Sequence, residues 1–128
     1  MPIEYQIDHV RRLVSTSAKG ILTAEDIFNY QSEVWSRPDV RGYDELVDMS
    51  EVESIVSPTS RKMRQLADIA ASMDEATVAA KFAIVAPKDL EYGLGRMYGA
   101  LRDSDPRSTK KVCVFRTAED ALAWIEKN

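Results

Sequence analysis

Apolar and polar residues alternate at the start of the chain, which predicts β-structure there. Ile3, Tyr5 and Ile7 occupy every second position and indicate a half-buried strand. Residues 8–12 would turn the chain, and residues 13–20 would form the hairpin partner of this strand. Three later segments also predict strands, and the last two are apolar enough to be buried on both faces: 44–49, 81–86 and 111–115.

Four segments after this hairpin have the period of an amphipathic helix. The first, residues 22–35, carries Thr23 as a helix cap with Asp26 three residues later, and Pro38 prevents it from continuing. The last, residues 117–128, begins with the same Thr-x-x-Asp arrangement. Both helices should therefore begin at their threonine.

The second and third helices are marked differently. The second would take Ser57 as its cap and Pro58 as its first helical residue. Its inward residues recur at steps of three and four: Met63, Leu66, Ala67, Ala70 and Met73. The third lies within residues 87–105, or begins only near Leu94. Three glycines disfavour a helix there, so Gly95 and Gly99 should permit close approach of a neighbouring element.

These segments give the order β-β-α-β-α-β-α-β-α. Apolar strands that alternate with amphipathic helices predict an α/β fold with a sheet that is parallel in its second half. The opening hairpin makes the sheet mixed. A chain of 128 residues is the size of one domain, so residues 1–128 should fold as a single unit.

This order, together with "LVDMSEVESIVS" at 46–57, resembles the STAS domain. That family includes the anti-sigma-factor antagonists (SpoIIAA-like proteins) and the cytoplasmic ends of sulfate transporters. Its strand-end pattern of apolar, Asp, apolar, Ser, any residue and Val stands here as "VDMSEV" at 47–52. The phrase "RPDVRGYDELVDMSEV" at 37–52 is more similar still to small stand-alone bacterial STAS-like proteins of no established function. The resemblance implies a SpoIIAA-like fold and a non-enzymatic regulatory or binding role.

One departure from the family bears on that role. The antagonists carry an Asp-Ser-Ser-Gly run after this loop, and the second serine is phosphorylated. In this chain the run falls on residues 56–59, where Val56 replaces the acid and Pro58 replaces the phosphoacceptor. The resemblance therefore implies that the serine switch of the family is missing from its usual place.

The start of the second helix is the first candidate for a binding surface. Helix starts favour anions, yet cations occupy the first turn here. A protein partner or an anion would contact this set: Asp48, Ser50, Ser57, Thr59, Ser60, Arg61 and Arg64. The alternative is a solvated helix face whose cations pair with nearby carboxylates.

Other functions remain open from the sequence. A small anionic or lipid-like molecule could bind in a pocket between the second and third helices. A third interpretation is an enzyme that uses Asp48, although accepting hydrogen bonds from loop amides would explain that residue. Trp124 lies beside the inward stripe of the last helix and is a candidate homodimer contact.

Composition narrows the partners. The chain has 17 basic and 21 acidic residues, a net charge of −4, which disfavours nucleic-acid binding. His9 and Cys113 are the only histidine and cysteine, so no cysteine–histidine cluster for a metal is present and a packed thiol is expected. We expect no cofactor. One cysteine, no signal segment and no long apolar run together predict a cytoplasmic protein without membrane insertion.

Overall fold

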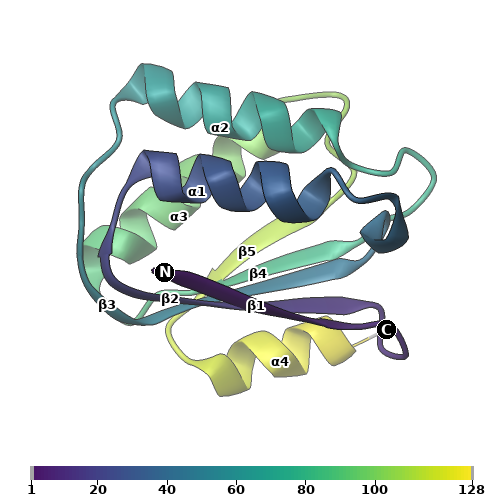
Figure 1. Cartoon of the computed structure of the whole chain (residues 1–128), viewed down its shortest axis with the longest axis horizontal. Helices are drawn as coiled ribbons and strands as arrows, with labels where there is room; N and C mark the ends of the chain where they lie inside the picture. Colours follow the sequence, from purple (N-terminus) through teal and green to yellow (C-terminus); the bar gives the residue numbers. More distant parts are fainter. Residues whose placement is uncertain (1, 128) are drawn as a thin grey trace.

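The computed structural model describes residues 2–127, and Figure 1 shows their arrangement. The strands are β1 (Ile3–Asp8), β2 (Leu13–Leu22), β3 (Asp44–Ile55), β4 (Lys81–Val85) and β5 (Lys111–Phe115). The α-helices are α1 (Ala24–Tyr30), α2 (Ser60–Ser72), α3 (Asp89–Asp103) and α4 (Ala118–Glu126). A π-helical turn, Gln31–Trp35, continues α1, and a short 3-10 turn, Pro38–Val40, precedes β3.

The five strands form one mixed sheet in the order β1-β2-β3-β4-β5. β1 pairs antiparallel with β2, and every other pairing is parallel. Helices α1, α2 and α3 cover one face of the sheet, and α4 covers the other (Figure 1). The predicted mixed α/β fold and its element order are therefore confirmed.

Strand β4 shows how the two layers share the core. Phe82 and Ile84 face the cluster formed with α2 and α3, whereas Ala83 and Val85 pack on the α4 side. This alternation explains why the strand is wholly apolar. The same prediction for β5 is only partly right, because β5 is an edge strand and most of it is half-buried.

The predicted caps of the first and last helices are confirmed. Thr23 accepts a hydrogen bond from the Asp26 amide at 3.1 Å, and the Asp26 side chain accepts from the Thr23 amide at 3.0 Å. Thr117 caps α4 by accepting from the Asp120 amide at 3.2 Å. These side chains replace the carbonyl partners that amides at a helix start lack.

The predicted start of α2 is wrong by two residues. Thr59, not Ser57, is the cap, because its hydroxyl accepts from the Lys62 amide at 3.1 Å. Pro58 precedes the helix instead of opening it. Three hydroxyl residues lie within four positions here, so several registers have a possible cap and the sequence alone does not choose among them.

The third predicted strand is also longer than expected. β3 continues past residue 49 to Ile55, pairing with β2 alone after it leaves β4 at Asp48. Two register shifts interrupt this extension, at residues 49–50 and at residue 53 of β3. The Asp48 carboxylate accepts the Ser50 amide at 2.8 Å, which holds the first irregularity. The segment interpreted as a strand end followed by a loop is therefore a bulged strand.

Helix α3 runs unbroken from Asp89, so the alternative start near Leu94 is wrong. The glycines allow the predicted close approach, although to a strand. A β-carbon at Gly95 would lie 3.1 Å from Val114, and one at Gly99 would lie 3.4 Å from Val112. Both valines belong to β5, which α3 therefore packs against closely.

Candidate functional site

A cavity of about 110 Å³ lies between the sheet and helices α1, α2 and α3. Most of its walls are apolar side chains, among them Met49, Met63, Leu66, Phe82, Ile84 and Leu94. Met49, Pro58 and Leu94 are half-buried at one end of the cavity, and Met73 and Asp74 are half-buried at the other. Its walls include α2 and α3, between which a small-molecule pocket was one alternative from the sequence, together with α1 and the sheet.

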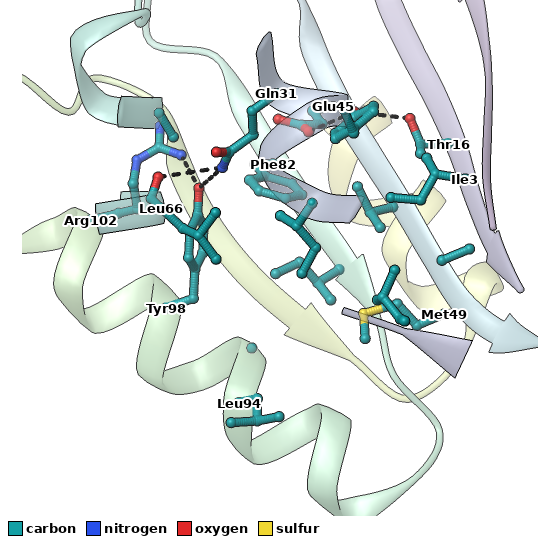
Figure 2. Close-up of a pocket in the computed structure, with 18 of the residues that line it drawn as sticks. Ile3, Thr16, Gln31, Glu45, Met49, Leu66, Phe82, Leu94, Tyr98 and Arg102 are labelled. Atoms are coloured by element: carbon teal, nitrogen blue, oxygen red, sulfur yellow. Dashed lines mark hydrogen bonds between the residues drawn. The ribbon is translucent and has the colours of Figure 1, made fainter. Parts of the chain in front are cut away.

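Polar side chains gather at the opposite end of this cavity, around Glu45 of β3 (Figure 2). The Tyr30 hydroxyl donates to Glu45 Oε2 at 2.8 Å and accepts from Thr16 at 2.9 Å. Trp35 Nε1 donates to the same carboxylate at 3.0 Å. Lys110 Nζ lies 3.3 Å from Glu45 Oε1 and 3.3 Å from the centre of the Trp35 ring.

Burial perturbs the ionisable groups of this end. It lowers the pKa of the Lys110 ammonium, which the neighbouring Glu45 carboxylate opposes. It also raises the pKa of Tyr30 well above the usual tyrosine value, and the Glu45 charge adds to that rise. Glu45 and Lys110 thus form a buried ion pair. Each charge offsets the cost of burying the other.

A second buried ion pair closes the cavity beside the first. Arg102 of α3 donates to both carboxylate oxygens of Asp74, at 2.8 and 2.6 Å, and to the Tyr98 hydroxyl at 2.9 Å. Asp74 also accepts from the Thr109 and Lys110 amides, at 3.0 and 3.2 Å. Burial raises the pKa of Tyr98 to about 12 against the opposing effect of Arg102. This network ties the end of α2 to α3 and to the loop before β5.

Two buried oxygens of the cavity wall are not part of this hydrogen-bond network. Gln31 Oε1 and Glu91 Oε2 are buried and have no hydrogen-bond partner among residues 2–127. The amide nitrogen of Gln31 makes only long contacts, to the Leu66 carbonyl at 3.4 Å and the Tyr98 hydroxyl at 3.5 Å (Figure 2). Buried polar groups without partners are rare, and each calls for an explanation.

The residues that the sequence singled out do not line the cavity. Pro58 lines the cavity, whereas its neighbours Ser57, Thr59 and Ser60 are exposed. Thr59 serves as the α2 cap. Asp48 and Ser50 bond to each other within β3, so accepting an amide hydrogen bond is the role that Asp48 has here.

Arg61 and Arg64 project from the exposed face of α2. Neither takes part in any ion pair found in residues 2–127. The face is therefore solvated, as one interpretation of the sequence held, but the pairing with nearby carboxylates that it assumed is wrong. Both charges remain available to a partner.

The remaining residues of interest from the sequence are Trp124, His9 and Cys113. The Trp124 ring is half-buried, lying 5.5 Å from the Phe115 ring and 5.4 Å from the Lys81 ammonium, measured between centres. His9 bonds to the Tyr43 hydroxyl at 2.7 Å in the turn between β1 and β2. Cys113 lies in β5 at the other edge of the sheet, so these two residues cannot act as a pair.

Four residues of the cavity wall were not predicted from the sequence: Glu91, Gln31, Glu45 and Lys110. A signal for Glu91 was present, since it lies four residues before Gly95 and seven before Tyr98, on the inward face of α3. Acidic residues in a first helical turn are ordinarily exposed and need no explanation, so the pattern alone gave no reason to choose it.

Within residues 2–127 no three histidine, cysteine or carboxylate side chains converge on a point suited to a metal ion. None of the helices in this part of the chain is long and apolar enough to cross a bilayer.

Comparison with known proteins supports the architecture. No protein-family model matches the sequence, and no curated protein matches it. Among solved structures, the chain is similar to an uncharacterized protein of the DUF3478 family with a SpoIIAA-like fold from Shewanella loihica PV-4. The TM-score is 0.61 at 18% sequence identity, over 96% of this chain and 93% of the other. The SpoIIAA-like fold that the STAS resemblance implied is therefore confirmed.

Proposed function

We propose that this chain is a non-enzymatic binding protein that holds a small, mostly apolar molecule under α1, α2 and α3. The observation that carries the proposal is the cavity of about 110 Å³, since cores are normally packed without voids of this size. An engineered apolar cavity of about 150 Å³ holds benzene, so this one suits a molecule of roughly four to six non-hydrogen atoms.

Filling the cavity tests this proposal. Ala70 lines it, so Ala70→Leu should occupy the space, whereas Ala100→Leu places the same side chain on the exposed face of α3. Short-chain alcohols and amines, titrated into methyl-labelled protein, should shift the NMR signals of Met63 and Leu94 saturably in wild type and in Ala100→Leu. They should not do so in Ala70→Leu. Equal shifts in Ala70→Leu, or no cavity shifts in wild type, would remove the proposal.

A second function is favoured by the free cations of α2. We infer that a protein partner with an acidic surface docks on Arg61 and Arg64, which have no ion pair within residues 2–127. The contact would be constitutive, because Pro58 stands at the family's phosphoacceptor position. Affinity purification should retain a partner with wild type and lose it with Arg61→Glu plus Arg64→Glu. Retention by that variant would exclude this surface.

A homodimer through Trp124 is a further proposal. Its half-buried ring leaves some area for a second copy of the chain. Sedimentation should then show a dimer that Trp124→Ala weakens. A strict monomer at high protein concentration would contradict it.

A further inference from the structure

Glu91 is a buried acid without an evident structural task. Its residue is 4% exposed, and its Oε2 has no hydrogen-bond partner among residues 2–127. None of the ion pairs in that part of the chain includes it. It lines the cavity one turn before Leu94. Acids are almost never this buried unless they are paired, so a partner from outside the chain would explain Glu91.

The open polar atoms of the cavity share one property. Glu91 Oε2 and Gln31 Oε1 are both oxygens, and an ionised carboxylate or an amide oxygen only accepts hydrogen bonds. They lie toward opposite ends, because Glu91 and the Tyr98 contact of Gln31 are seven residues apart in α3, about 10 Å along its axis. A ligand that presented an acceptor would thus meet an acceptor at the Glu91 end, whereas a donor would be satisfied there.

The two cations that line the cavity, Arg102 and Lys110, are not free to bind an acidic ligand. Arg102 donates to Asp74, Tyr98 and Ser108, which occupies its Nε, Nη1 and Nη2 atoms. Lys110 is paired with Glu45. Each buried cation therefore already has its own carboxylate, and Glu91 is the acid of the cavity wall that has no cation.

We propose that the polar group of the ligand is a hydrogen-bond donor held by the Glu91 carboxylate, and that an amine is preferred to a carboxylate. This inference rests on the proposed function, because it needs the cavity to bind a small molecule. An ammonium would supply both the donor and the opposite charge at a residue that is only 4% exposed. Its short alkyl chain would lie among Met63, Ile84 and Leu94. The anionic ligand considered from the sequence is disfavoured on the same grounds.

Three probes with the same alkyl chain test the preference: n-butylamine, 1-butanol and butyrate. Each would be titrated into methyl-labelled full-length protein, and its dissociation constant would be read from the Leu94 and Met63 signals. We expect n-butylamine to bind wild type at least about ten-fold more tightly than butyrate, with 1-butanol between them.

Two variants connect that preference to Glu91. Glu91→Gln keeps the shape of the side chain and removes its charge, so the affinity for n-butylamine should fall to about that for 1-butanol. Asp103→Asn removes a charge from an exposed position of the same helix and should leave the three affinities as in wild type. Because Glu91→Gln keeps the size of the side chain, we expect it to fold, and unchanged amide spectra would show this.

The outcomes separate the two levels of the proposal. Butyrate that binds as tightly as n-butylamine, or an amine preference that survives in Glu91→Gln, would overturn the assignment of Glu91 while leaving the cavity as a binding site. If none of the three probes shifts the cavity methyl signals, the proposed function fails, and the assignment of Glu91 fails with it.

Discussion

Replacing Glu91 by leucine should stabilise the ligand-free protein, which is the reverse of what most core substitutions do. The wild-type carboxylate is buried at 4% exposure and has an oxygen without a partner in the described chain. An unsatisfied buried polar group costs about 1–3 kcal/mol, and more when it is charged. Leucine has a similar size and helix propensity, and it would contact an apolar wall.

A smaller effect opposes this gain. Glu91 is the third residue of α3, where a negative side chain interacts favourably with the helix start by about 0.3–1 kcal/mol. The net change in the free energy of unfolding should therefore be a gain of about 1–2 kcal/mol. For a chain of this length, the melting temperature would rise by roughly 3–10 °C.

Differential scanning calorimetry of three proteins would measure this. Glu119→Leu is the matched control, since it removes an exposed acid from the first turn of α4 and should lower stability slightly. Addition of n-butylamine should raise the melting temperature of wild type more than that of Glu91→Leu, because the stabilisation by a ligand grows with its affinity. If Glu91→Leu melts below both wild type and Glu119→Leu, the carboxylate stabilises the fold, and our account of it is wrong.

Three further predictions concern the framework of the cavity. Asp74→Ala leaves a buried guanidinium unpaired and should cost about 3–5 kcal/mol in urea unfolding, whereas Asp68→Ala breaks only an exposed pair and should have a small effect. Thr59→Ala should destabilise the protein by about 1 kcal/mol and Ser57→Ala should not, since Thr59 caps α2; equal losses would contradict this assignment. The Tyr98 pKa of about 12 lies above its value in the unfolded chain, so the associated stability is full below pH 10 and lost as the pH rises through 12. About 3 kcal/mol should disappear over that range in wild type, and less in Tyr98→Phe.

The sequence predicted those features of the fold that depend on local chemistry. Thr23 and Thr117 stand alone as possible caps before an apolar stripe, so their positions were unambiguous. Near α2 several hydroxyl residues compete, and the tertiary position of the helix selects Thr59. The extension of β3 could not be predicted, because it depends on pairing with β2 and on a bulge that hides the alternation of side chains.

Little of the candidate site could be predicted from local sequence patterns. Glu45 and Lys110 are 65 residues apart and meet only because the sheet brings the start of β3 beside the loop before β5. A cavity is likewise a property of packing, and no periodicity reports the space that side chains fail to fill. The hydroxyls and cations of the "SPTSRK" segment predicted a binding surface, yet its residue on the cavity wall is Pro58, which has neither.

The buried polar groups of this protein divide into two kinds, and the division separates framework from site. Asp74 with Arg102, and Glu45 with Lys110, are mutually satisfied, so their presence is explained by the fold that they join. Glu91 gains no comparable partner from the described chain, although it is equally buried. The other buried ionic groups obey the rule that a buried charge has a partner. A residue that breaks this rule without a compensating contact is the most informative one. On this argument, the proposed ligand contact lies neither in the STAS-like motif nor on the cationic helix face, but at Glu91 on the inward side of α3.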